Sequence, residues 1–186
     1  IVVDKKEKVK VNAITIVGNE VLTDKKLKRT MKKTNEKNKL VNFFRTKKFV
    51  EENFEADKQL IIDKYNEMGY RDATILVDSV SPHDDKTVNV YLEIDEGQRY
   101  YLRNVNWVGN TLYSAEQMDY LLRMKKGDVY NQKLLSERVA EDEDAISNLY
   151  YNNGYIFSSV EPVEVNIVGD SIDLEMRVIE GPQATI

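Results

Sequence analysis

Three groups of side chains in this chain could carry chemistry, and each must be weighed against a structural role. The single imidazole, His83, is a possible general base or metal ligand. Four consecutive acids, Glu141 to Asp144, have the chemistry of a cation site. A basic stretch contains two adjacent aromatic residues, Phe43 and Phe44, which could stack on bases while the cations hold phosphates.

The first two groups do not predict an active site. His83 lies among turn residues, beside Pro82 and Asp84, and no Ser or Cys nucleophile can be assigned to it. Glu141 to Asp144 are expected on a helix, where consecutive positions point in different directions and form a solvated face. The glycines form no phosphate or dinucleotide loop, and the absence of cysteine excludes thiol chemistry. We therefore expect no enzyme activity, no cofactor and no metal.

The basic stretch makes the charge asymmetric. Residues 1–50 carry 15 Lys or Arg against 5 Asp or Glu, whereas the rest of the chain carries 12 against 27. A nucleic-acid module would explain the basic end, but the GXXG loop of the KH domain and the aromatic RRM signature are absent. We expect no nucleic-acid partner and keep this function as the least favoured alternative. The basic residues are Lys25, Lys26, Lys28, Arg29, Lys32, Lys33, Lys37, Lys39, Arg45, Lys47 and Lys48.

The chain repeats itself, and the repeat determines how these groups are positioned. A Val-Gly-Asn turn around Gly18 returns 91 residues later, a Gly-Tyr pair at Gly69 returns 85 later, and an acidic-Gly pair at Gly97 returns 84 later. The fall of the offset from 91 to 85 indicates about six extra residues in the first copy, within residues 35–48.

The duplication predicts two domains in a chain of 186 residues. We expect residues 9–97 to form the first and residues 98–182 the second. Residues 1–8 then resemble the tail of a preceding copy with its junction, and residues 183–186 the start of a following one. No apolar run approaches the roughly 18 residues that a membrane helix needs, so this piece should be soluble.

Each copy predicts the element order β-α-α-β-β. An opening strand ends at the Gly-Asn turn, and a first helix begins at Thr23 or at Ser114, where the spacing is that of a capping box. A second helix ends at Gly69 or Gly154, and in the second copy it should run unbroken from residue 135 to residue 150.

Two alternating apolar runs then predict a β-hairpin. In the first copy Ala73, Ile75 and Val77 alternate with polar or exposed positions, and residues 81–86 should form the turn. The resulting fold class is α+β, with two tandem domains, each a three-stranded mixed sheet covered on one face by two helices.

This order, with a Gly-Tyr pair closing the second helix and an acidic-Gly pair at the domain exit, resembles the polypeptide-transport-associated (POTRA) repeat. It is most similar to the periplasmic arm of the BamA family of outer-membrane β-barrel assembly factors, over essentially the whole chain. The first copy, with Phe43 and Phe44 ahead of Lys48 and Phe49, resembles the third of five such repeats. The second, with KGDVYN at residues 126–131, resembles the fourth.

The resemblance implies a non-enzymatic scaffold at the periplasmic face of the outer membrane. Its expected partners are unfolded outer-membrane proteins, accessory lipoproteins and its own C-terminal membrane barrel, which is not in this chain. The arm of a two-partner secretion or organelle-import transporter is the alternative. Such arms usually carry fewer repeats, so the expectation of copies on both sides favours the assembly factor.

Strand addition is the expected mode of binding. A three-stranded sheet has two edge strands with unpaired backbone groups, and an extended segment can pair with either. In the POTRA family the second strand is the exposed edge, which corresponds to residues 71–80 and 156–165. Pro162 removes a donor from the second of these, between Glu161 and Glu164. We therefore expect binding on the first copy, at Asp72, Ala73, Thr74, Ile75, Leu76, Val77 and Asp78.

Two further sites are expected. The insertion either enlarges the first core or presents a contact patch for a partner or for membrane headgroups, formed by Phe43, Phe44, Lys47 and Lys48. The connection between the copies is short, so it should act as a hinge of limited range. The hinge residues are Glu96, Gly97, Gln98, Arg99 and Tyr100.

Overall fold

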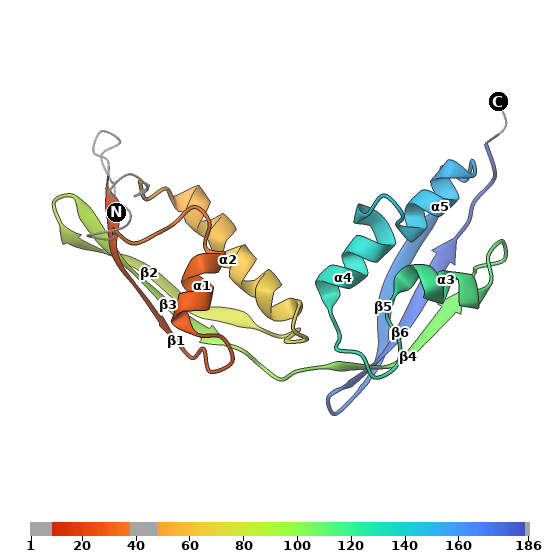
Figure 1. Ribbon diagram of the computed structural model, residues 1–186, viewed down its shortest axis with the longest axis horizontal. Helices are drawn as coiled ribbons and strands as arrows, with labels where there is room; N and C mark the ends of the chain where they lie inside the picture. The colour runs from red at the N-terminus through yellow and green to blue at the C-terminus, as the bar shows by residue number, and fades with distance from the viewer. Residues whose placement is uncertain (1–8, 38–47, 185–186) are drawn as a thin grey trace. The chain divides into compact units, whose positions relative to one another are not determined.

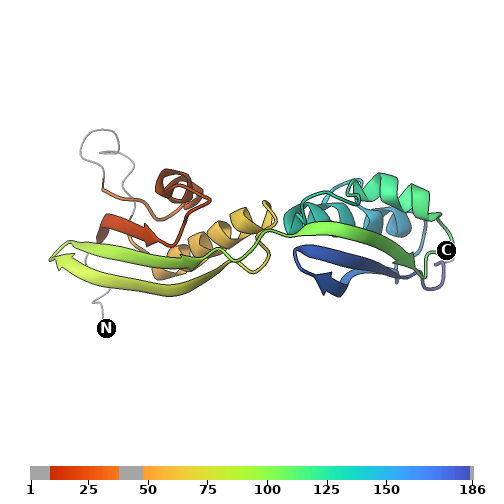
Figure 2. The same ribbon diagram turned by 90° about the horizontal axis from the view of Figure 1, so that it is seen from below.

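The computed structural model describes residues 9–37 and 48–184, which fall into two compact units (Figure 1). One unit comprises the described residues up to 65 together with residues 72–97. The other comprises residues 66–71 and the described residues from 98 onward. Each unit has a three-stranded sheet with its helices on one face, as Figure 2 shows, so the α+β fold class is confirmed.

The first unit contains β1 (Lys10–Val17), α1 (Asp24–Thr30), α2 (Glu51–Asn66), β2 (Thr74–Asp84) and β3 (Thr87–Asp95). The sheet order is β1-β3-β2, with β1 parallel and β2 antiparallel to the central β3. Apolar side chains from both helices meet those of β1 and β3 in the core. Its fully or nearly fully buried members include Ile14, Leu27, Phe54, Ile61, Tyr65, Val90, Leu92 and Ile94.

The second unit repeats this topology in the order β4-β6-β5. Its strands are β4 (Tyr101–Val108), β5 (Ser159–Val168) and β6 (Ser171–Ile179). Its helices are α3 (Ala115–Leu122), α4 (Gln132–Ser136), a π-helical turn (Glu137–Glu141) and α5 (Ile146–Asn152). The core includes Leu102, Met118, Leu122, Ile146, Tyr150, Ile172, Leu174 and Met176.

The expected unbroken second helix of this unit is wrong, because a buried arginine divides it. The Arg138 guanidinium lies in the interior, where its Nε donates to the Leu121 carbonyl at 2.7 Å. Its Nη1 donates to Asp142 at 2.8 Å and to Asp144 at 2.6 Å. Asp142 leaves the helix with extended backbone, which lets both carboxylates return to the arginine. Two of the four consecutive acids, Asp142 and Asp144, therefore bind a buried cation rather than forming part of a solvated helix face.

The local helix signals are confirmed. The Thr23 side chain accepts from the backbone N–H of Lys26, and Ser114 and Gln117 form a reciprocal capping box. These interactions satisfy N–H groups that the first turn of a helix leaves without partners, which is why α1 and α3 begin at these residues.

The Gly-Asn turns require glycine. Gly18 and Gly109 have φ of +80° and +89°. A Cβ atom would lie 2.0 Å from the Ile94 carbonyl oxygen at the first position and 2.1 Å from that of Val178 at the second. The turn backbone thus lies directly against the end of the central strand, at a distance that only glycine allows.

The first hairpin differs from its expected form. β2 continues to Asp84, so the turn is Asp85-Lys86 and His83 lies within the strand at a bulge. A second bulge between Ile75 and Val77 reverses the alternation. The regular alternation expected for Ala73, Ile75 and Val77 is therefore broken, and Val77 is 43% exposed.

A polar cluster stiffens the helix-free face of the second sheet. Asp173 lies between two strand positions that are buried against the helices, so its carboxylate faces the other side. It accepts from Arg103 Nε at 2.8 Å and from Asn104 Nδ2 at 2.7 Å. The hydrogen bond from Arg103 lowers the pKa of Asp173 to about 2.

This pKa predicts an acid-sensitive contribution to stability. A carboxylate whose pKa is lowered on folding stabilises the native state at pH values above its unfolded pKa, and this contribution is lost as pH falls toward the folded pKa. Stability of the second unit should therefore decline between about pH 4 and pH 2, and D173N should flatten this decline. Urea unfolding across this range measures it, with D170N in the exposed hairpin turn as the control. Parallel acid profiles for wild type and D173N would contradict the prediction.

Candidate interaction surface: the sheet edges

Within the described residues, the side chains that could carry chemistry are not assembled into a reactive site. His83 is exposed at the bulge of β2, and Asp142 and Asp144 are paired with Arg138. Within residues 9–37 and 48–184, no group of three or more His, Asp or Glu is arranged to hold a metal ion. In the same ranges, no helix combines the length and apolar character needed to cross a bilayer.

A glutamate directly after the last strand binds the opening turn in each unit: Glu96 is buried and Glu180 is half-buried. Glu96 accepts from the Tyr65 hydroxyl at 2.7 Å and from the Val21 backbone N–H at 3.0 Å. In the second unit Glu180 accepts from the Tyr150 hydroxyl at 3.1 Å and from backbone N–H groups of the opening turn. Sequence reasoning assigned no such role to either residue. Their place in the repeated acidic-Gly pair was the signal that could have found them.

The contacts of Glu180 determine the protonation states of Glu180 and Tyr150. Burial by itself would raise the pKa of Glu180, but the hydrogen bonds from Thr111, Leu112 and Tyr150 outweigh it and leave that pKa lowered. Burial and the bond to Glu180 raise the pKa of Tyr150. The tyrosine therefore stays a neutral donor and the glutamate a charged acceptor at neutral pH.

The outer edge of β1 is covered by its own chain. The Lys37 N–H donates to the Val11 carbonyl at 2.8 Å. The Ile14 N–H, which also points away from β3, donates to Glu36 Oε1 at 2.8 Å. Lys28 Nζ lies 2.7 Å from the same carboxylate oxygen. One edge of the first sheet is thus closed by residues 36 and 37.

The β4 edge is covered only at its beginning. The Leu102 N–H donates to the Asp128 carbonyl at 2.8 Å, and the Leu102 carbonyl accepts from the Gly127 N–H at 2.7 Å. The Tyr130 N–H donates to the Tyr100 carbonyl at 2.9 Å. Residues 127–130 therefore run as a short antiparallel segment beside the first part of β4.

The hydrogen-bond direction along β2 follows from these contacts. Because Ile14 directs its N–H away from β3, its register partner Val90 must direct its own N–H and C=O at β1. Val90 is also opposite Val80 of β2. Val80 therefore receives no ladder bonds from Val90, and its own backbone groups point out of the sheet.

The same holds along most of this strand. Asp78 and Ile75 are paired with Leu92 and Ile94, which follow Val90 at steps of two along β3. Their N–H and C=O groups consequently face outward as well. β2 thus presents outward donors and acceptors at Ile75, Asp78 and Val80, whereas Asp72 and Ala73, which were also expected to bind, precede the strand.

The side chains around this row are apolar and accessible. Leu76 is 57% exposed, and Ile75 is half-buried beside it. Asp78 turns to the helix side, where it forms an ion pair with Lys58 of α2. An extended segment paired with this edge would meet apolar side chains at one end and a neutralised acid at the other.

The corresponding edge in the second unit is interrupted. Pro162 lies opposite Met176 and lacks a donor, and a bulge follows between Glu164 and Asn166. Glu164 accepts a hydrogen bond from the Tyr130 hydroxyl at 2.8 Å. Burial of the hydroxyl raises the pKa of Tyr130, and this hydrogen bond raises it further. The acid is thereby held against its own unit.

The expected hinge residues lie on both sides of the division between the units. Glu96 is buried in the first unit, and Tyr100 is buried in the core of the second. Gly97 has φ of +63°, and Gln98 and Arg99 are exposed. Hinge motion here stays a prediction.

The expected contact patch lies mostly outside the described residues, since Phe43, Phe44 and Lys47 belong to residues 38–47. Lys48 is described: it is exposed and forms an isolated β-bridge with Lys10. Phe49 is half-buried with its ring centroid 5.8 Å from that of Phe54. This part of the insertion contributes to packing, and use of the patch by a partner stays a prediction.

Comparison with known proteins identifies the repeat. Residues 9–97 and 100–181 each match the POTRA family, described as a surface antigen variable number repeat. Over 185 residues the chain is 29% identical to the outer membrane protein assembly factor BamA of Neisseria meningitidis. Over 150 residues it is also 29% identical to a putative outer membrane protein assembly factor of Treponema pallidum.

These matches cover most of this chain but little of the relatives. They span 97% and 78% of the chain, yet only 22% and 17% of the Neisseria and Treponema proteins. Among solved structures, POTRA3-5 of Haemophilus influenzae BamA aligns with a TM-score of 0.70 and 25% identity. That alignment covers 98% of this chain and 71% of the Haemophilus chain.

Proposed function

Because this chain belongs to the POTRA family, as two tandem domains similar to those of BamA proteins, we propose that it forms part of an outer-membrane assembly factor. In this role it is a periplasmic, non-enzymatic scaffold that receives unfolded β-barrel proteins. Accessory lipoproteins and the protein's own membrane barrel are its further partners. The similarity to assembly factors supports the role, and the open edge of β2 supports the mode of binding.

The outward row of backbone groups on β2 carries this proposal. Main-chain hydrogen bonds supply affinity without reading a particular side-chain sequence. A scaffold that handles many different clients needs this kind of recognition. Barrel precursors consist of segments with strand-forming alternation, so each offers a chain that can pair along Ile75–Val80.

The two repeats contribute unequally under this proposal. The β5 edge lacks a donor at Pro162 and bends at its bulge, whereas the only proline of β2, Pro82, lies near the hairpin turn. The first repeat therefore receives the client strand. Recognition by nucleic-acid contacts is not proposed, because the family match covers both repeats.

Replacing Ile75 by proline tests the proposal. The Ile75 N–H points outward, so I75P removes a donor that a client would use while keeping the ladder to β3. We expect binding of a synthetic peptide copying a barrel strand to weaken about tenfold or more. Fluorescence anisotropy of the labelled peptide measures affinity, and amide hydrogen exchange at residues 74–80 locates the contact.

The matched control is V160P, at the equivalent position of β5, opposite Val178. It makes the same substitution on the interrupted edge and should leave peptide affinity unchanged. Circular dichroism and urea unfolding must show that both variants retain their fold. If folded I75P binds the peptide as tightly as wild type, addition at this edge is excluded.

A further inference from the structure

The second part of β4 is a short open edge. Leu102 directs both of its backbone groups at residues 127–128, away from its register partner Ile172. Val105 and Trp107 are paired with residues that follow Ile172 at steps of two, so their N–H and C=O groups point outward as well. No described residue donates to these carbonyls or accepts from these N–H groups.

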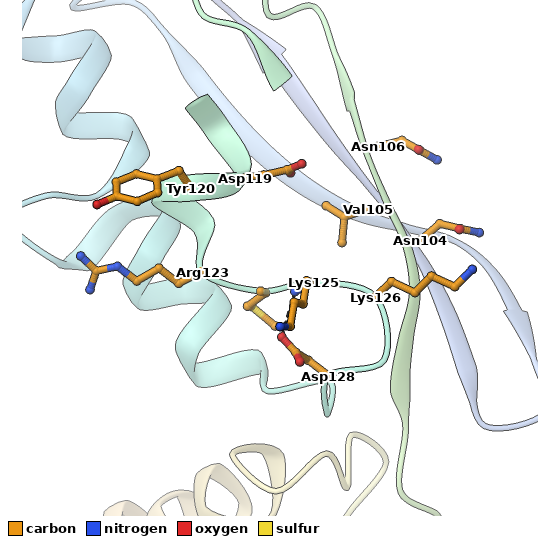
Figure 3. Close-up of a pocket in the computed structure, with 10 residues that line it drawn as sticks. Asn104, Val105, Asn106, Asp119, Tyr120, Arg123, Lys125, Lys126 and Asp128 are labelled. Atoms are coloured by element: carbon orange, nitrogen blue, oxygen red, sulfur yellow. Dashed lines mark hydrogen bonds between the residues drawn. The ribbon is translucent and has the colours of Figure 1, made fainter. Parts of the chain in front are cut away.

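A cavity of about 640 Å³ lies against this open edge. β4 forms one wall, the end of α3 a second, and the loop that leads to residue 127 a third. Figure 3 shows the Val105 side chain between Asp119 and Lys125, with Lys126 extended toward Asn104. The cavity therefore adjoins the place where a strand paired with β4 would lie.

Two cationic side chains of this cavity have no ion-pair partner among the described residues. Lys125 and Lys126 are exposed, and neither forms an ion pair with any described residue. The two carboxylates of the cavity are oriented by neutral donors: Asp119 accepts from the Trp107 indole N–H at 2.7 Å and Asp128 from the Lys125 backbone N–H at 2.9 Å. The two ammonium groups beside the outward backbone N–H suit an anion that also accepts a backbone hydrogen bond.

The first unit shows the same position already filled. Ile14 corresponds to Val105 in the repeat, and its outward N–H donates to the Glu36 carboxylate at 2.8 Å. Lys28 lies 2.7 Å from that carboxylate. The first unit thus supplies its own carboxylate and ammonium at the edge. At the equivalent position the second unit has the outward N–H of Val105, the side chains of Lys125 and Lys126, and a cavity in place of the carboxylate.

We propose that the β4 edge binds the free C-terminal carboxylate of an extended polypeptide. The peptide runs antiparallel to β4, in the same direction as residues 127–130. Its C-terminal end lies next to residue 127, where that covering segment begins. Its last residue lies opposite Val105: the carboxylate accepts from the Val105 N–H beside Lys125 and Lys126, and the last amide donates to the Val105 carbonyl. The residue two positions earlier pairs with Trp107 in the same way.

This site goes beyond the proposed function. It involves a different strand, in the other repeat, and it recognises a chain end rather than an internal segment. Binding here does not require the β2 edge, so I75P should leave it intact.

Paired peptides test the proposal directly. The probe is a synthetic peptide of about six alternating Val and Thr residues with an acetylated N-terminus, made once as the free acid and once as the C-terminal amide. Trp107 is the only tryptophan of the chain, so its fluorescence reports binding at this edge. We expect the amide to bind about tenfold or more weakly than the acid. Equal affinities, or displacement of the peptide by equimolar acetate, would overturn the proposal.

Variants separate the parts of the site. V105P removes the outward N–H without breaking the β4–β6 ladder, and it should abolish the difference between acid and amide. K125Q combined with K126Q should weaken binding of the acid about three- to tenfold and leave the amide unaffected. K86Q, in the exposed hairpin turn of the first unit, is the matched control for loss of a surface lysine. The proposal fails if folded K125Q/K126Q binds the acid as K86Q does.

Discussion

G109A should destabilise the second unit by about 4 kcal/mol or more, because two costs combine at this residue. The left-handed backbone, with φ of +89°, disfavours any L side chain. The added Cβ would also lie 2.1 Å from the Val178 carbonyl oxygen, which belongs to the central strand and cannot withdraw without disturbing the ladder. Urea unfolding followed by circular dichroism, with Trp107 fluorescence as a probe of this unit, measures the loss.

G127A in the same unit is the matched control. Gly127 has φ of +90°, but nothing lies within 4 Å of its added Cβ. It should cost only the left-handed strain, about 1–2 kcal/mol. The difference between the two variants isolates the steric clash. Equal losses would mean that the turn at Gly109 moves off the strand without penalty.

D57A should destabilise the first unit by about 3–5 kcal/mol, because it leaves several buried donors without an acceptor. The Asp57 carboxylate is fully buried on α2. It accepts from the backbone N–H of Lys32 at 2.9 Å, of Lys33 at 3.0 Å and of Thr34 at 2.5 Å. These three N–H groups follow α1, so the carboxylate ties the two helices together. Urea unfolding monitored by circular dichroism measures the effect.

D63A, two turns farther along α2, controls for the change in helix propensity. Asp63 is only half-buried and accepts from the Gln59 side chain at 2.8 Å. Its loss should change the free energy of unfolding by less than about 1 kcal/mol. Similar losses for D57A and D63A would show that water replaces the carboxylate at the end of α1.

The elements that could be predicted are those with local signals. Thr23 and Ser114 begin helices because their side chains satisfy N–H groups in the next turn, and this interaction spans three residues. The glycines of the repeated turns have left-handed backbone in both copies, a conformation that favours glycine over any other residue. The repetition of these signals in one order identified the two domains.

The features that could not be predicted depend on contacts between distant residues. Arg138 occupies a position on the helical pattern that is compatible with a solvated face. Its burial depends on the Leu121 carbonyl, 17 residues away in the chain, as well as on Asp142 and Asp144. Likewise, the bulge beside Leu76 follows from pairing with β3 and leaves no mark in the alternation of β2.

The candidate sites show the same division. The family resemblance identified the second strand as an edge, because no local sequence pattern determines the order of strands in a sheet. Which residues on that edge face outward depends on the β1–β3 register and on the Ile14–Glu36 bond. The open part of β4 was missed entirely, since it is defined by where the segment at residues 127–130 stops.

The parallel pairing of the first and last strands in each unit has a mechanical consequence. Tension on a POTRA domain enters through its opening strand and leaves through its closing strand, which are neighbours in the sheet. Because these strands are parallel, pulling their outer ends apart slides one along the other and loads all of the ladder bonds at once. The Glu96–Tyr65 and Glu180–Tyr150 bonds lie at the end where the load leaves. Under such a load each domain would act as a shear-loaded link, whose ladder bonds resist together rather than one at a time.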